Sequence, residues 1–115
     1  MKTHKDLIVW NKSMDLVQYT YELSSSYPDC EKFGLTSQMR RAAVSVPSNI
    51  AEGAARNSTK EYIRFLYISL GSLSELETQF LISNRLGYIK NYSEESITEI
   101  RKMLLSLIKK LKEFI

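Results

Sequence analysis

The sequence predicts an all-α protein with an up-down-up-down antiparallel four-helix bundle. Four stretches place apolar residues three, four and seven positions apart, which is the spacing of one helix face. The chain has only 4 glycines and 2 prolines in 115 residues, which favours long helices over turn-rich β structure. The breaks between the stretches are short, which favours antiparallel neighbours. At this length we expect a single domain over residues 1–115, with a disordered tail at residues 1–5.

The first helix is expected from about Asp6 to Ser26. Pro28 disfavours helix at Tyr27, and Gly34 permits an unusual backbone turn, so the stretch YPDCEKFG is predicted to be a loop. The apolar face of this helix is expected to consist of Leu7, Trp10, Met14, Val17 and Tyr21.

The second helix is expected from an N-cap at Thr36 to about Arg56, although it contains a proline. Pro47 removes its own N–H and frees the carbonyl of Ala43, which typically costs about 3 kcal/mol in a helix interior. A helix that stopped at this proline would have no reason to resume in register at Ile50. We therefore predict one kinked helix, in which Gly53 allows a close helix approach. Its apolar face keeps one phase throughout and comprises Leu35, Met39, Ala43, Val46, Ile50 and Gly53.

The third helix opens at the stretch STKE, where Ser58 and Glu61 have capping-box spacing, and Gly87 is a plausible C-terminal stop. Its inner face is expected to consist of Tyr62, Phe65, Leu66, Ser69, Leu73, Leu76 and Phe80. The fourth helix is expected to be capped by Ser93 and followed by two glutamates that suit the positive end of a helix. Its apolar stripe comprises Ile97, Ile100, Leu104, Leu107, Ile108 and Leu111.

Several apolar residues fall outside these inner faces, which indicates a second buried surface. On this interpretation the protein is a homo-oligomer. A closed ring would satisfy every copy of such a surface, and a two-fold dimer is the alternative assembly. The alternative is a wide core face that covers most of these residues within one protomer. The residues assigned to the subunit interface are Tyr19, Leu23, Ile63, Tyr67 and Ile82.

The charge of the chain is mildly basic and unevenly distributed. The formal net charge is +3 and the pI is about 9.0, which is compatible with nucleic-acid binding without being diagnostic of it. Residues 35–56 hold three basic side chains against one acidic, and residues 89–115 hold six against four. One protomer offers too little charge for strong backbone binding, whereas a ring of copies would multiply it. The candidate nucleic-acid contacts are Arg40, Arg41, Arg56, Lys60, Arg64 and Lys102.

A polar stripe runs along the second helix through Ser45, Asn49 and Glu52, which are spaced about one turn apart. It is either a solvated face with weak ion pairs or a hydrogen-bonding network buried at a helix or subunit contact. Composition favours the solvated interpretation. If the stripe is a network, Glu77 on the third helix is a candidate partner for an arginine of the second.

Residue types that carry catalysis or bind metals are sparse. His4 is the only histidine, so neither a di-iron bundle site nor a zinc site is expected. Cys30 is the only cysteine, which excludes an intramolecular disulfide, and no glycine-rich phosphate loop is present. The opening MKTHKD is too polar for a signal peptide, and no apolar run approaches bilayer length. We therefore expect a cytoplasmic protein that is not an enzyme, uses no metal or cofactor and has no membrane partner.

Three stretches carry a resemblance to a known family. They are DLIVWNKSMDLV, FGLTSQMRRAAVSVPSNIAEGAAR and KEYIRFLYISLGSLSELETQF, and they cover most of the first three helices. Together they resemble the four-helix-bundle family named for 23S rRNA intervening-sequence proteins, which is similar to the accessory variability protein of diversity-generating retroelements. The second stretch, with its arginine pair, its proline and NIAEG in that order, is the most specific.

The resemblance implies a homo-oligomeric helical ring, commonly a pentamer, with a basic surface that contacts RNA or a reverse-transcriptase-like protein. It also implies that the polar stripe serves contacts rather than chemistry. We therefore expect a non-enzymatic oligomeric protein that binds structured RNA or another nucleic acid. The alternative is a protein–protein scaffold or adaptor that does not bind nucleic acid.

Overall fold

The protein consists of four long helices and two single-turn 3-10 helices, as described for residues 3–115 by a computed structural model. The long helices are α1 (Ile8–Ser24), α2 (Leu35–Ala54), α3 (Thr59–Arg85) and α4 (Glu94–Lys112). The 3-10 helices η1 (His4–Asp6) and η2 (Asp29–Glu31) precede α1 and α2. No strand occurs within residues 3–115, which confirms the predicted all-α fold with four helices.

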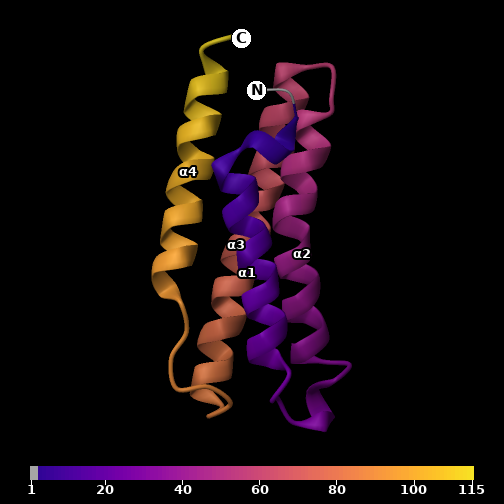
Figure 1. The fold of residues 1–115 in the computed structure, drawn as a ribbon, viewed down its shortest axis with the longest axis vertical. Coiled ribbons are helices and arrows are strands. Elements are labelled where there is room, and N and C mark those ends of the chain that lie inside the picture. Colours follow the sequence, from indigo (N-terminus) through magenta and orange to yellow (C-terminus); the bar gives the residue numbers. More distant parts are fainter. Residues whose placement is uncertain (1–2) are drawn as a thin grey trace.

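The four helices lie side by side along the long axis of a molecule that measures 46 × 23 × 20 Å (Figure 1). The segments that join α1 to α2 and α3 to α4 lie at one end, whereas the α2–α3 turn and the C-terminus lie at the other (Figure 1). Helix α2 packs most extensively against α3, and α1 contacts both α2 and α4. The two ends of α2 therefore lie at opposite ends of the molecule.

Helix α2 continues through Pro47, as the phase of its apolar face predicts. The hydroxyl of Ser69 on α3 donates to the carbonyl of Val46 at 2.8 Å, so a neighbouring helix supplies a hydrogen bond beside the proline. Gly53 allows the close approach expected of it, because a Cβ at this position would lie only 2.8 Å from the Cβ of Phe65. Side chains with no exposed surface line the predicted face: Met39, Ala43, Val46 and Ile50.

The N-terminus of α2 corrects the predicted cap. The helix begins at Leu35, and the expected cap Thr36 is instead a buried residue of the first turn. The N–H of Leu35 donates to Oε1 of Glu31 at 3.1 Å, and a carboxylate suits the positive end of a helix. Oε2 of the same carboxylate accepts a 2.8 Å hydrogen bond from the Tyr88 hydroxyl, which raises the pKa of Tyr88. The stabilising group thus comes from the preceding loop and is held in place by the α3–α4 segment.

Helix α1 is rotated relative to the prediction, so only part of the predicted face meets the core. Leu7 is buried, and Trp10 and Val17 are half-buried against the core. Met14 and Tyr21 of the predicted face are 44% and 42% exposed, whereas Leu16, which lies off that face, is buried. Small polar residues explain the error, because each hydroxyl donates to the carbonyl four residues earlier at 2.7–2.8 Å and so enters the core without an unpaired donor. The buried residues of α1 are Val9, Ser13, Leu16, Thr20 and Ser24.

The predicted inner faces of α3 and α4 are confirmed, but the core is wider than expected. Three residues assigned to a subunit interface belong to the protomer instead. Ile63 is a buried core residue, and Tyr19 and Leu23 are half-buried against the core. The Tyr19 hydroxyl also accepts a 2.9 Å hydrogen bond from the N–H of Ser93. The wide-face alternative therefore accounts for these three, whereas Tyr67 and Ile82 remain 45% and 42% exposed.

Of the four predicted helix-end signals, Thr36 is not a cap, and Ser58 forms only half of the predicted capping box. The Ser58 hydroxyl accepts from the N–H of Glu61 at 3.2 Å and caps α3, whereas the Glu61 carboxylate pairs with Arg64. Gly87, with φ of 80°, ends α3, and the N–H groups of Gly87 and Tyr88 bond back to the carbonyls of Asn84 and Ser83 as in a Schellman motif. Ser93 occupies the N-cap position of α4, but its side chain makes no capping hydrogen bond.

The predicted disordered tail is wrong for residues 3–5. Thr3 caps η1, and the His4 ring meets the edge of Trp10 with ring centroids 5.0 Å apart, so these residues fold back onto α1. Residues 1–2 lie outside the described residues.

Candidate nucleic-acid interface

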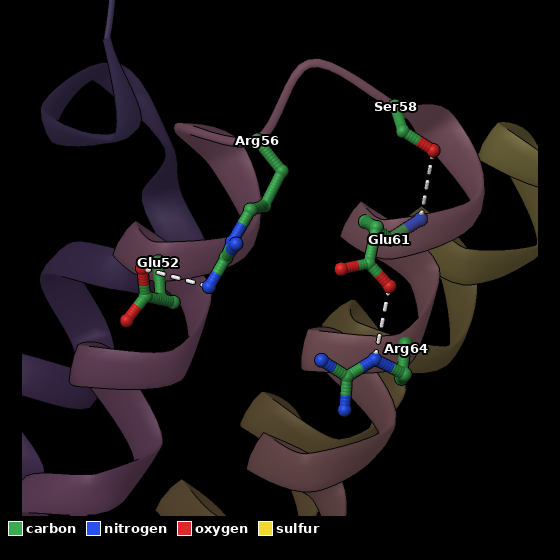
Figure 2. A network of polar contacts seen from close by, with 5 residues as sticks. All are labelled: Glu52, Arg56, Ser58, Glu61 and Arg64. Carbon is green, nitrogen blue, oxygen red and sulfur yellow. Dashed lines mark hydrogen bonds and ion pairs between the residues drawn. The ribbon is translucent and has the colours of Figure 1, made fainter.

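One group of predicted contacts gathers where α2 ends and α3 begins, and we call it the turn cluster (Figure 2). It comprises Glu52, Arg56, Lys60, Glu61, Arg64 and Phe65. The guanidinium groups of Arg56 and Arg64 lie 4.8 and 4.6 Å from the centre of the Phe65 ring. Cation–π contacts of this kind hold both arginines against α3.

Carboxylates neutralise much of the turn cluster. Arg56 forms a 3.5 Å ion pair with Glu52, and Arg64 forms a 3.0 Å ion pair with Glu61 (Figure 2). The hydrogen bond from Arg64 lowers the pKa of Glu61. Both pairs are exposed, and exposed pairs contribute little to stability. With three cations against two carboxylates, the turn cluster is only weakly basic.

A second group lies near the other end of α2, in a groove of about 650 Å³ between the α1–α2 loop and the two helices that it joins. We call it the α2 groove. Arg40 is anchored there, because its Nε donates to the Ser24 hydroxyl at 3.0 Å and its guanidinium lies 4.6 Å from the Tyr21 ring centre. Arg41 forms no hydrogen bond or ion pair within residues 3–115. The lining of the groove includes Tyr21, Lys32, Phe33, Arg40, Arg41 and Ser45.

Lys102 stands apart from the other predicted contacts. It lies on α4 beside Glu94, Glu95 and Glu99 in a separate shallow depression. Carboxylates around an amine disfavour a phosphate, so the structure does not add Lys102 to either basic group.

Part of the polar stripe of α2 forms a network, whereas Glu52 is exposed and forms an ion pair with Arg56. The side-chain amide of Asn49 donates to the carbonyl and the hydroxyl of Ser45 at 2.8 and 2.9 Å. The Ser45 hydroxyl in turn shares a 2.8 Å hydrogen bond with that of Ser72 on α3. The prediction for Glu77 is wrong, because its arginine partner is Arg101 of α4, at 2.7 Å, and not an arginine of α2.

Within residues 3–115 no three histidine, cysteine, aspartate or glutamate side chains gather in a way that could hold a metal ion. Cys30 is an exposed thiol. None of the helices in this range combines the length and hydropathy that a membrane span requires.

A comparison with known families identifies the family to which this chain belongs. The family described as 23S rRNA-intervening sequence protein matches residues 5–113. The chain belongs to this family. The rRNA-intervening sequence assignment thus covers all four helices, whereas the stretches that carry the resemblance lie mainly in the first three. A comparison with curated proteins finds no match.

A solved structure supports the same family assignment. It is the crystal structure of a protein of unknown function from the S23 ribosomal protein family of Bacteroides thetaiotaomicron. The two chains share 27% identity with a TM-score of 0.77, over 89% of this chain and 96% of the other. The likeness covers the whole helical unit, so both groups of cations of this intervening-sequence family member lie on a fold that it shares with that protein.

Sequence reasoning missed three residues of the α2 groove in this intervening-sequence protein. Tyr21 was assigned to the core, and Lys32 and Phe33 were assigned only to a loop. The sequence does contain an indication of exposure at Phe33. This aromatic residue follows a lysine in a polar loop that has no apolar face to bury it. Phe33 is 90% exposed, and the Lys32 amine lies 5.5 Å from the centre of its ring.

Proposed function

We propose that this member of the 23S rRNA-intervening sequence family is a non-enzymatic cytoplasmic protein that binds structured RNA. Basic surfaces repeated around a homo-oligomeric ring would provide the contacts. The observation that carries this proposal is the α2 groove, where Arg41 forms no ion pair within residues 3–115 and the lining includes no acidic residue. A guanidinium of this kind is available for bidentate contact with phosphate.

The two ends of α2 would contribute unequally to RNA binding. Arg40 and Arg41 lie about 23 Å from Arg56 along the helix axis, at a rise of about 1.5 Å per residue. One protomer would therefore touch the RNA backbone at two separated places. The turn cluster, with Arg56, Lys60 and Arg64, would add weaker contacts because its carboxylates also face solvent.

Exposed apolar side chains support the ring. The positions of the loops in Figure 1 agree with an up-down-up-down antiparallel protomer. The outer face of α3 exposes Tyr67, Ile68, Leu81 and Ile82. A second apolar patch lies outside the α2 groove, where the exposed Met14 lines a depression with Trp10 and Pro47. Two different patches favour a head-to-tail contact, which closes into a ring. Gly71 on α3 has no atom within 4 Å of the place where a Cβ would lie, so another helix has room to approach there.

Binding to RNA tests the central claim. Filter retention of a folded RNA hairpin should be strong at low salt and should fall steeply as salt rises, because phosphate contacts release counterions. An acidic protein of similar size serves as the background control. Negligible retention at low salt would overturn RNA binding and favour the protein-scaffold alternative.

Light scattering tests the assembly. We expect a mass several times the 13.3 kDa of the chain, and five times it for the pentamer that the family resemblance implies. Ile82→Glu should reduce the mass by placing a charge in an apolar contact, whereas Ser106→Glu at an exposed site on α4 should not. A mass of 13.3 kDa for the unmodified protein would exclude the ring.

A further inference from the structure

We propose that the α2 groove holds an unpaired nucleotide, with its base against Phe33 and its phosphate between Lys32 and Arg41. This inference rests on the proposed RNA binding and assigns a distinct kind of contact to one site. Double-stranded RNA hides its bases, so a site that stacks a base selects loops, bulges or ends. The inference follows from three features of the groove: its aromatic ring, its cations and its shape.

The aromatic ring is Phe33, whose side chain finds no place in the protomer. Its 90% exposure is the highest among the large apolar residues of residues 3–115. Burial of such a ring normally contributes to stability, so its exposure leaves a flat apolar surface facing solvent. Bases stack on such surfaces without regard to sequence, because each of them has a π face.

The cations that flank this ring have no carboxylate partner. The Lys32 amine lies 5.5 Å from the centre of the Phe33 ring, and the side chains of Lys32 and Arg41 form no ion pair within residues 3–115. The nearby carboxylate of Glu31 is occupied, because its two oxygens accept from the Leu35 N–H and the Tyr88 hydroxyl. Glu31 does not line the groove, and no other acidic residue does, so the groove itself offers a phosphate only cations. Glu75 lines a neighbouring depression with Arg41, but forms no ion pair with it within residues 3–115.

The shape of the groove suits one nucleotide. Its volume of about 650 Å³ lies within the range of about 300–1,000 Å³ typical of small-molecule sites. The wall is rigid, because Arg40 is tied to the Ser24 hydroxyl and to the Tyr21 carbonyl, at 3.0 and 3.3 Å. Ser45 also lines the groove, and its hydroxyl is held by hydrogen bonds with Asn49 and Ser72.

Fluorescence anisotropy with two RNA probes tests this site on the full chain. The probes are a single-stranded oligouridylate and a blunt RNA duplex of equal length. Phe33→Leu should weaken oligouridylate binding by about 5- to 100-fold, the equivalent of losing one stacked base, and leave duplex binding unchanged. Phe33→Trp should retain binding. Phe114→Leu is the matched control, because Phe114 is also exposed, at 72%, but lies beyond α4.

The outcomes separate the two proposals. If both probes bind and Phe33→Leu matches the unmodified protein, the nucleotide site is wrong while RNA binding stands. If neither probe binds at low salt, the proposed function fails, and the site fails with it. If Phe33→Leu instead reduces the mass measured by light scattering, Phe33 lies in a contact between copies of the chain, which also overturns the site.

Discussion

The two ends of α2 carry arginines in opposite situations. At the turn cluster, Arg56 and Arg64 each pair with a glutamate and pack on Phe65, a ring that is only 8% exposed. At the α2 groove, Arg41 has no such partner and the Phe33 ring is 90% exposed. Arginine and phenylalanine are therefore paired and packed at the turn cluster, whereas they remain unpaired and exposed at the α2 groove. Formal charge does not distinguish these cases, because the difference lies in the partners.

The largest expected effect comes from adding a side chain at Gly53, where α2 packs closely against α3 beside the turn cluster. In Gly53→Ala the new Cβ would lie 2.8 Å from the Phe65 Cβ and 3.1 Å from the Tyr62 carbonyl oxygen. Helices α2 and α3 must then separate, so the free energy of unfolding should fall by about 3 kcal/mol in urea denaturation.

Gly71→Ala is the matched control for that measurement, made at concentrations too low for association. Nothing lies within 4 Å of its new Cβ, and alanine favours helix by about 1 kcal/mol relative to glycine. Similar stabilities for the two variants would contradict the close packing of α2 on α3 at Gly53.

The next effect compares the two arginine environments directly. Arg41→Gln and Arg64→Gln remove the same charge, but only Arg41 lacks a carboxylate partner. Affinity for a folded RNA hairpin should fall about tenfold in Arg41→Gln, as for the loss of a charged hydrogen bond, and about twofold or less in Arg64→Gln. Filter binding over a salt series measures both. Equal losses of affinity would mean that Glu52 and Glu61 do not weaken RNA binding at the turn cluster.

A smaller effect concerns the polar network midway along α2. Asn49→Ala removes two hydrogen bonds to Ser45, and the half-buried site retains access to water. The free energy of unfolding should fall by about 1 kcal/mol, with little change in RNA affinity. Ser48→Ala, at an exposed neighbouring position, is the control. Thermal melting measures the stability of each variant, and fluorescence anisotropy measures its RNA affinity. A loss of affinity in Asn49→Ala without a loss of stability would contradict the structural role of the network.

The smallest effect is electrostatic and confined to Glu61. Arg64 lowers the pKa of this carboxyl, so the pair stabilises the fold above the ordinary glutamate pKa, and this contribution is lost as pH falls through the lowered value. In a carboxyl-carbon NMR titration, Arg64→Gln should raise the Glu61 midpoint toward the ordinary glutamate value. An unchanged midpoint would show that the ion pair does not persist in solution.

The sequence by itself determined the features that depend on residues close together in the chain. The apolar period across Pro47 predicts one continuous α2, because a helix repeats its face every few residues. The cap at Ser58 and the end at Gly87 likewise depend on hydrogen bonds that span three to five residues. The positions of the cationic residues, such as Arg40 and Arg41, are also evident from the sequence alone.

Only the tertiary structure decided which faces and charges are free. Ser13, Thr20 and Ser24 enter the core because their hydroxyls find carbonyls of their own helix, which rotates α1 away from the face that hydropathy predicts. Glu31 is drawn to Tyr88, 57 residues away, and so leaves the groove without an acid. Burial and pairing depend on neighbours brought together by folding, and neither hydropathy nor formal charge specifies them along the chain.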